Sequence, residues 1–323
     1  MLIAGIEVGV LKGVIQAGFV GRGSRSIPAN DIALRRSSRG DLDAFLAQRF
    51  PAAPGVTWRD DSIEGPEGQI RMRTYTPRDV NPNNAILYYI HGGGLIFSSI
   101  ETYDARCSHW ASRSNSTVIS IDYRLSPEHP YPGPLDDCMA GLRWVAEHKS
   151  QGEKVIVVGD SAGGGLAAAV ALRNRDEDMC QLSAQVLVYP MLDDRNLIPQ
   201  QGLTGPLMAW SYGDNALGWN SYLEGNAGAP VLPEYASPAR AIDLRGLPPT
   251  YIDTGTKDIF LAEDIIYAQR LLAAEVPTKA HVWNGALHGF DYFAPNSRLA
   301  RRAWNERFDF LERINQDRDL LGH

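Results

Sequence analysis

The stretch Gly159-Asp160-Ser161-Ala162-Gly163-Gly164-Gly165 stands between an apolar run over residues 154–158 and a second apolar run over residues 166–172. Two glycines flank Ser161 at the spacing Gly-x-Ser-x-Gly, which is typical of a strand that turns sharply into a helix. Close backbone approach in such a turn excludes a side chain at either glycine, and it strains the serine so that the hydroxyl is exposed. We therefore predict a strand, a tight turn and a helix, with Ser161 at the tip.

The helix predicted after this turn begins just past Ser161. Its unpaired N–H groups and positive dipole end would point at whatever the serine attacks. The same spacing also occurs by chance in ordinary loops, which is the structural alternative. The strand before it and the helix after it are the context that a nucleophilic serine requires. The stretch therefore indicates a nucleophile and a site for negative charge.

A second glycine-rich stretch, His91-Gly92-Gly93-Gly94, follows an apolar run over residues 85–90. Three glycines after a strand add little packing, but they present backbone N–H groups that no Cβ shields. Such donors can stabilise the oxyanion of a tetrahedral intermediate. A flexible loop is the structural alternative. We expect His91 to organise the turn through hydrogen bonds and not to act as a base.

An activated serine requires a base, and the base requires an acid that orients it. The chain has seven histidines, at positions 91, 109, 129, 148, 281, 288 and 323. Only His288 lies in a loop just after a late strand, which we predict over residues 279–283. Open parallel sheets place their sites at that end of the strands. We therefore predict that His288 is the base.

The acid should fall between the serine and the histidine if the chain order is serine, acid, histidine. Asp258 lies just past a strand predicted over residues 249–255, where a loop can reach the site. Asp253 lies inside that strand and is the second candidate. Glu263 and Asp264 fall in the first turn of the next predicted helix, where they suit its dipole.

Together these stretches resemble the α/β-hydrolase fold and, within it, the hormone-sensitive-lipase-like carboxylesterases. The resemblance covers residues from about 85 to 290. It rests on four stretches: His91 to Gly94, Asp122 to Pro132, Gly159 to Gly164 and His288 to Phe290. It implies a mostly parallel central sheet flanked by helices, with a helical cap over the active site.

The resemblance implies roles for individual residues. Ser161 would be the nucleophile and His288 the base. The oxyanion hole would use the backbone N–H groups of Gly93, Gly94 and Ala162, with Gly92 as a further candidate. The acid of the family stands in Asp-Pro-Leu-x-Asp-Glu, whereas residues 258–263 read Asp-Ile-Phe-Leu-Ala-Glu. The proline and the second aspartate are missing, but Asp258 still falls on the position of the acid.

A length of 323 residues, with strand and helix patterns that alternate from residue 85, predicts one α/β domain. Earlier runs at 56–64 and 70–77 predict antiparallel edge strands. The resemblance assigns a cap to about residues 1–50 and to an insertion at about 191–235. We expect aromatic residues of the insertion to line an apolar substrate pocket: Trp210, Trp219 and Tyr222. The alternative is that they pack the cap against the body.

The net charge of −7 argues against a nucleic-acid partner. A local group of arginines is expected to form a solvated face: Arg22, Arg25, Arg35, Arg36 and Arg39. Glu7 and Lys12 interrupt the apolar run over residues 2–20, and no basic residue precedes it. We therefore expect neither an export signal nor a membrane span.

Three cysteines, at positions 107, 138 and 180, show no metal spacing. They predict buried thiols in a reducing compartment, and hence a cytoplasmic location. No cofactor motif appears, and the expected chemistry requires neither a cofactor nor a metal.

We therefore expect a serine carboxylester hydrolase that acts on short- to medium-chain acyl esters through an acyl-enzyme. Its expected partner is a small-molecule ester, and a homodimer is an assembly that the sequence leaves open. Amide or lactone hydrolysis at the same triad is the enzymatic alternative. A non-catalytic small-molecule receptor on the same fold is the alternative from another class. Such receptors lack the triad histidine, so the presence of His288 favours the enzyme.

Overall fold

The computed structural model describes residues 5–20, 31–37, 40–200 and 209–318. Within them, one eight-stranded sheet runs through the molecule in the order β1-β2-β4-β3-β5-β6-β7-β8. Its strands are β1 (Val56–Gly65), β2 (Gly68–Pro77), β3 (Ile86–Ile90), β4 (Val118–Ile121), β5 (Val155–Asp160), β6 (Ala184–Val188), β7 (Thr250–Lys257) and β8 (Thr278–Leu287).

The first two strands pair antiparallel with each other, and β2 pairs antiparallel with β4. All the other neighbours in the sheet are parallel. The strands β3, β4, β5 and β6 are buried along their whole length, because helices cover both faces of a parallel sheet. This burial explains why they read as continuous apolar runs. The predicted fold class, a mostly parallel sheet with an antiparallel edge, is confirmed.

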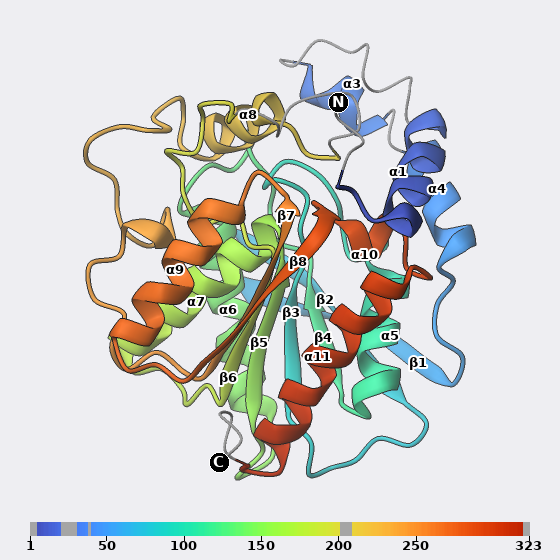
Figure 1. The fold of residues 1–323 in the computed structure, drawn as a ribbon. Coiled ribbons are helices and arrows are strands. Elements are labelled where there is room, and N and C mark those ends of the chain that lie inside the picture. The colour runs from blue at the N-terminus through green and yellow to red at the C-terminus, as the bar shows by residue number, and fades with distance from the viewer. Residues whose placement is uncertain (1–4, 21–30, 38–39, 201–208, 319–323) are drawn as a thin grey trace.

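Helices cover both faces of the sheet, and further helices lie outside these two layers. They are α1 (Val8–Val20), α3 (Ile32–Ser37), α4 (Gly40–Arg49), α5 (Asp104–Ser114), α6 (Gly133–His148), α7 (Ala162–Glu177), α8 (Tyr212–Tyr222), α9 (Leu261–Ala273), α10 (Phe290–Phe293) and α11 (Arg298–Asn315), with a short 3₁₀ turn at Pro238–Arg240. Helices α6, α7 and α9 pack on one face, and α5 and α11 pack on the other (Figure 1). Helices α3 and α8 lie beyond the carboxyl edge of the parallel strands (Figure 1).

Two arginines of α3 attach this helix to the rest of the molecule. Arg35 pairs with Asp214 of α8 at 2.7 Å. The Arg36 guanidinium donates from Nε to the carbonyl oxygen of Ile96 at 2.7 Å and pairs with Glu128. The expected solvated face is therefore wrong for these two residues, because their guanidinium groups cap carbonyl and carboxylate oxygens of neighbouring loops. Arg22, Arg25 and Arg39 lie outside the described residues.

A row of buried charges joins the strand β7 to the helices α5 and α11. Arg307, fully buried on α11, donates to Asp253 of β7 and to Asp291 of α10. Arg106 of α5 donates to the same Asp291 at 2.7 Å. Burial opposes ionisation of Asp291, but the two guanidinium groups outweigh it and hold the pKa of that carboxyl well below its usual range. This row of buried charges therefore links α5 and α11 to the strand β7 of the sheet.

This row generates a stability prediction. Replacing Asp253 by Ala should lower the free energy of unfolding by about 3–5 kcal/mol, because Arg307 then remains buried without one of its carboxylates. Urea denaturation of the wild type and the variant measures the change. Asp243→Ala is the matched control, since Asp243 pairs with Arg245 on the open surface, where ion pairs add little. Equal shifts of the unfolding midpoint in both variants would contradict the structural role of the row.

Candidate active site

Ser161 stands between the end of β5 and the start of α7, with φ 55° and ψ −124°. Residues other than glycine rarely adopt a positive φ, so the backbone is strained at this point. Two hydrogen bonds hold it there. The Ser161 N–H donates to the carbonyl oxygen of Val188, and its own carbonyl oxygen accepts from the N–H of Met191, both at 2.9 Å. The predicted strand, sharp turn and helix are all present.

The flanking glycines are required by close backbone contacts. A Cβ atom at Gly159 would lie 2.1 Å from the carbonyl oxygen of Gly163. A Cβ atom at Gly163 would lie 2.1 Å from the carbonyl oxygen of Ile90, at the end of β3. Any side chain at either position would therefore force the strands and α7 apart.

The predicted base, His288, and the predicted acid, Asp258, form one hydrogen-bonded line with Ser161. The His288 Nε2 atom lies 2.9 Å from the Ser161 Oγ atom, and its Nδ1 atom lies 2.8 Å from Oδ2 of Asp258. The other oxygen of Asp258 accepts from the N–H of Phe260 at 3.0 Å. All three side chains of this line are buried. A proton on Nδ1, donated to the carboxylate, leaves the lone pair of Nε2 facing the serine hydroxyl.

Neighbouring strands bring Asp258 and His288 together. The strands β7 and β8 are parallel neighbours, so Asp258, just past Lys257, and His288, just past Leu287, emerge at the same edge of the sheet. Two aromatic rings then enclose the imidazole. The rings of Phe260 and Tyr189 meet it edge to face, with centroid distances of 5.0 and 4.9 Å. These contacts fix the plane of the imidazole.

Asp253, the second candidate for the acid, does not reach His288. It is buried in β7, where its carboxylate accepts hydrogen bonds from Arg307, from Trp283 Nε1 and from the Tyr251 hydroxyl. A residue inside the strand projects from a face of the sheet, whereas a residue past its end reaches the edge. The structure therefore brings Asp258, and not Asp253, to the histidine.

Glu263 and Asp264 lie in the first turn of α9, as expected. Both are also buried, which was not expected. The carboxylate of Glu263 accepts from the backbone N–H groups of Leu192 and Asp193, at 2.7 and 3.2 Å. Burial raises the pKa of both carboxyls well above the usual range. Glu263 thus ties the segment after β6 to the first turn of α9.

The loop after β3 lies beside the serine. Gly93 and Gly94 have φ values of 121° and 62°, and both line the cavity that contains Ser161 and His288. A Cβ atom at Gly93 would lie 2.3 Å from the carbonyl oxygen of Phe97, and one at Gly94 would lie 2.0 Å from the Trp210 ring. Only glycine therefore allows this loop to approach its neighbours so closely.

The other two predicted oxyanion residues differ in position. Ala162 is the first residue of α7, so its N–H has no partner within the helix. Gly92 packs deeper, where a Cβ atom would lie 2.7 Å from both the Asp160 carbonyl oxygen and the Tyr103 hydroxyl. Beside it, the His91 ring stacks on Tyr123 with a centroid distance of 4.3 Å, and the Tyr123 hydroxyl donates to the His91 carbonyl oxygen. These contacts match the expected turn-organising role of that histidine.

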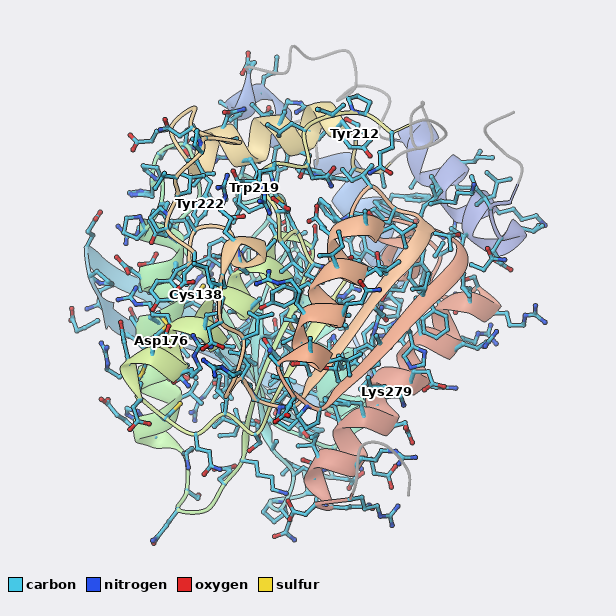
Figure 2. All side chains as sticks on the ribbon, turned by 60° about the vertical axis from the view of Figure 1, so that its left-hand side comes forward. Cys138, Asp176, Tyr212, Trp219, Tyr222 and Lys279 are labelled. Atoms are coloured by element: carbon cyan, nitrogen blue, oxygen red, sulfur yellow. The ribbon has the colours of Figure 1, made fainter. Side chains whose placement is uncertain are left out.

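A cavity of about 70 Å³ lies over the serine and the histidine; we call it the catalytic cavity. Trp210 is among its lining residues, whereas Trp219 and Tyr222 are not. The expected role of all three in a substrate pocket stays a prediction. Trp219 and Tyr222 line a separate cavity of about 10 Å³ with residues of α7, such as Leu166. Figure 2 shows both side chains beneath α8, turned towards the body of the molecule.

The catalytic cavity also contains residues that the sequence reasoning missed. They are Ser98, Thr102, Tyr103, Arg106, Asp160, Tyr189, Ala209, Gly289, Tyr292 and Phe293. Two of these residues could have been found from the sequence, because Asp160 belongs to the serine motif itself and Tyr189 directly follows a parallel strand. Arg106 carried no sequence signal, because it lies on a helix that contains no motif.

Two further findings concern the described residues. They contain no group of three or more His, Cys, Asp or Glu side chains arranged to hold a metal ion. Among their helices, none combines the length and the apolar character needed to cross a membrane.

Comparison with known proteins agrees with this geometry. Residues 87–292 match the family described as alpha/beta hydrolase fold. The chain is 34% identical over 266 residues to Esterase LipI of Mycobacterium tuberculosis, covering 80% of this chain and 82% of that relative. Two solved structures resemble it along nearly the whole length. A bacterial heroin esterase has a TM-score of 0.85 at 30% identity, and a hyperthermophilic esterase from the archaeon Pyrobaculum calidifontis has a TM-score of 0.83 at 30% identity; each covers 97% of this chain and 99% of its own.

The chain therefore belongs to the hormone-sensitive-lipase-like branch of the α/β-hydrolase family. Within that family it is a serine carboxylesterase.

The two aspartates of β7 and its following loop generate opposite predictions. Asp258→Asn should lower kcat by about 10⁴-fold with little loss of stability, because an amide disturbs the tautomer of His288. Asp253→Asn should lower the thermal midpoint and leave the kcat of the folded enzyme near that of the wild type. Steady-state kinetics with p-nitrophenyl acetate and thermal unfolding measure the two effects. A reversed pattern of losses would assign the acid to Asp253.

Proposed function

We propose that this esterase forms its acyl-enzyme on Ser161, with His288 as the general base and Asp258 as the orienting acid. The observation that carries the proposal is the continuous hydrogen-bonded line from Asp258 through His288 to Ser161 at the floor of the catalytic cavity. As the serine oxygen attacks the ester carbonyl, its proton passes to Nε2 of the histidine. The carboxylate then stabilises the imidazolium that forms.

The negative charge on the former carbonyl oxygen would be held by backbone N–H groups. Gly93, Gly94 and Ala162 supply these donors in the proposal, with Gly92 as a further candidate. The proton of the histidine next passes to the leaving alcohol, and water repeats the sequence to release the acid. The glycines support this role because they bring backbone to the cavity without side chains.

The substrates in this proposal are soluble esters with acyl chains of roughly two to eight carbons, bound in an enclosed pocket. A cap formed by about residues 1–50 and 191–235 would cover them. Its described helices support this, since Arg35 of α3 pairs with Asp214 of α8. The Trp210 ring, which belongs to the insertion, packs directly on Gly94. Residues 201–208 of the insertion lie outside the described residues.

Amide and lactone hydrolysis would use the same three residues, and assays with matched esters, amides and lactones distinguish them. The non-catalytic receptor does not fit, because such a receptor would lack the bond between His288 and Ser161. We also propose a cytoplasmic location, which the three free cysteines support. The homodimer considered from the sequence stays a prediction for light scattering to test.

Replacing the nucleophile tests the proposal most simply. Ser161→Ala should lower kcat by about 10⁶-fold, because the remaining groups cannot form an acyl-enzyme. Circular dichroism and thermal unfolding should match those of the wild type, since the substitution removes one hydroxyl. A folded Ser161→Ala enzyme that still hydrolyses p-nitrophenyl butyrate at near wild-type rates would disprove the assignment.

A series of p-nitrophenyl esters tests the depth of the pocket. We expect kcat/KM to rise with each added methylene until the pocket is full, and then to fall. Each methylene should lower the free energy of the transition state by up to about 0.8 kcal/mol. Trp210→Ala should move the optimum to longer chains, because the indole borders the catalytic cavity. Trp219→Ala is the matched control, and its optimum should stay in place. A steady rise towards long-chain emulsified triglycerides, or equal shifts in both variants, would contradict the proposed pocket.

A further inference from the structure

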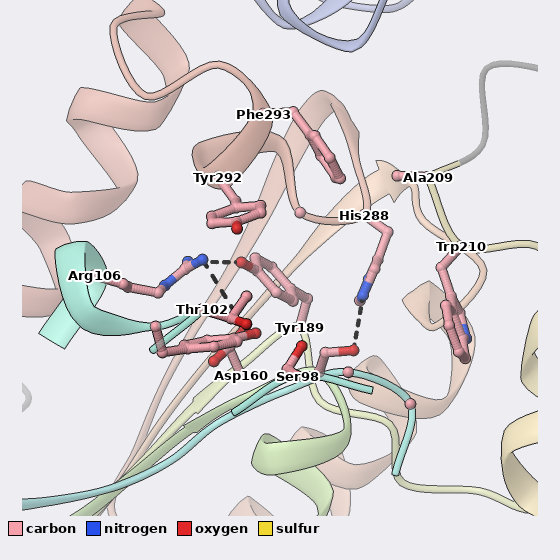
Figure 3. A pocket seen from close by; sticks show the side chains of 15 residues that line it. Ser98, Thr102, Arg106, Asp160, Tyr189, Ala209, Trp210, His288, Tyr292 and Phe293 are labelled. Atoms are coloured by element: carbon pink, nitrogen blue, oxygen red, sulfur yellow. Dashed lines mark hydrogen bonds and ion pairs between the residues drawn. The ribbon is translucent and has the colours of Figure 1, made fainter. Parts of the chain in front are cut away.

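The catalytic cavity has two unlike sides. Trp210 and Ala209 form an apolar side near α8, whereas Thr102 and Arg106 lie on the opposite side of His288 (Figure 3). Ser98 is a third polar residue of the lining, and it lies next to the loop after β3 that contains Gly93 and Gly94. A Cβ atom at Gly93 would lie 2.8 Å from its Oγ atom. We call Ser98, Thr102 and Arg106 the polar wall.

The donors of the polar wall are largely unused. Among the described residues, neither the hydroxyl of Ser98 nor that of Thr102 makes a hydrogen bond. Ser98 also has φ 77°, a strained value that its loop maintains. Strain of this kind tends to persist where it places a group at a functional site.

Arg106 adds a buried guanidinium that is only partly bonded. Its side chain is 3% exposed. Its Nη2 atom donates to the Tyr189 hydroxyl and to Asp291, both at 2.7 Å. Its Nη1 atom lies 4.0 Å from the nearest Asp160 oxygen, and its Nε atom is buried without a partner among the described residues.

The other buried arginine of the same charge row provides the contrast. Arg307 donates from Nε, Nη1 and Nη2, and so uses all three nitrogens on Asp253 and Asp291. The Nε atom of Arg106 is closed off from the cavity, so the donor that a bound molecule could use is Nη1, which makes no hydrogen bond among the described residues while Arg106 lines the catalytic cavity.

The surrounding charges favour an uncharged partner for the polar wall. The buried row contains two guanidinium groups, from Arg106 and Arg307. Three buried carboxylates face them, from Asp160, Asp253 and Asp291. A further anion would therefore meet an excess of negative charge in a poorly solvated site. A neutral oxygen could accept hydrogen bonds there without that penalty.

We propose that the polar wall is a subsite for an uncharged oxygen, such as an ether, hydroxyl or carbonyl, that the substrate carries close to its scissile ester bond. The physiological substrates would then be esters of oxygen-substituted acids or alcohols, and not of plain hydrocarbon chains. This inference rests on the proposed function, because the same cavity must bind the ester that Ser161 attacks.

Two pairs of nearly isosteric esters test the subsite in the full-length enzyme. p-Nitrophenyl methoxyacetate against p-nitrophenyl butyrate probes the acyl half, and 2-methoxyethyl acetate against butyl acetate probes the alcohol half. The measured quantity is the ratio of kcat/KM between the oxygen-bearing ester and its hydrocarbon partner. Intrinsic reactivity cancels when this ratio is compared between the wild type and a variant.

The variants separate bonding from charge. Arg106→Lys keeps a cation beside Asp291 but removes the planar fork, and Thr102→Val removes a hydroxyl at almost constant volume. We expect each to lower the oxygen preference about tenfold in one of the two pairs, and that pair identifies which half of the substrate the wall contacts. Arg113→Lys, on the same helix but outside the cavity, is the matched control and should leave both ratios unchanged.

Three results have distinct meanings. If neither variant changes the kcat/KM ratio in either pair of esters, the donors do not bind the substrate oxygen, and the subsite is overturned. A wild-type preference for p-nitrophenyl hemisuccinate over the methoxyacetate, lost in Arg106→Lys, would replace the neutral oxygen with a carboxylate and so also overturn it. Failure of the wild type to hydrolyse any of these short esters would instead refute the proposed function.

Discussion

The backbone contact between the end of β5 and the start of α7 determines the rest of the site. At Gly159 and Gly163 the chains are so close that a Cβ atom would lie 2.1 Å from a carbonyl oxygen. This proximity, together with the hydrogen bonds of Ser161 to Val188 and Met191, keeps Ser161 at a positive φ. It also starts α7 directly after the serine, so that unpaired N–H groups and the positive end of the dipole meet at the reacting atoms.

The buried charges behind the sheet edge support the histidine from the other side. Arg106 and Asp291 both bond to the Tyr189 hydroxyl, at 2.7 Å each, and the Tyr189 ring packs on His288. The same Asp291 joins this group to α11 through Arg307. Structural stability and the orientation of the imidazole therefore depend on one bonded cluster. In the proposed subsite, the Nη1 atom of Arg106 is the donor of this cluster that a substrate oxygen would meet.

The sequence was sufficient where local backbone geometry determines the outcome. The glycine spacing around Ser161, and the positions of Asp258 and His288 just past parallel strands, follow from rules of strands and turns. The sequence did not reveal which face of α8 each aromatic residue would occupy, and in the structure Trp219 and Tyr222 line a different cavity from the catalytic cavity. It also could not show that Arg106, on a helix without a motif, reaches the cavity. Such contacts depend on the packing of distant segments and leave no periodic signal.

We propose that the strained turn places the Ser161 hydroxyl against His288, which activates it. Covalent labelling with a fluorophosphonate ester tests it directly, because such reagents react with a serine whose proton a base removes. Peptide mass spectrometry should find one adduct per chain, on Ser161, and esterase activity should fall in proportion to labelling. An adduct on another serine that tracks the loss of activity, or full labelling of Ser161 with activity retained, would contradict the account.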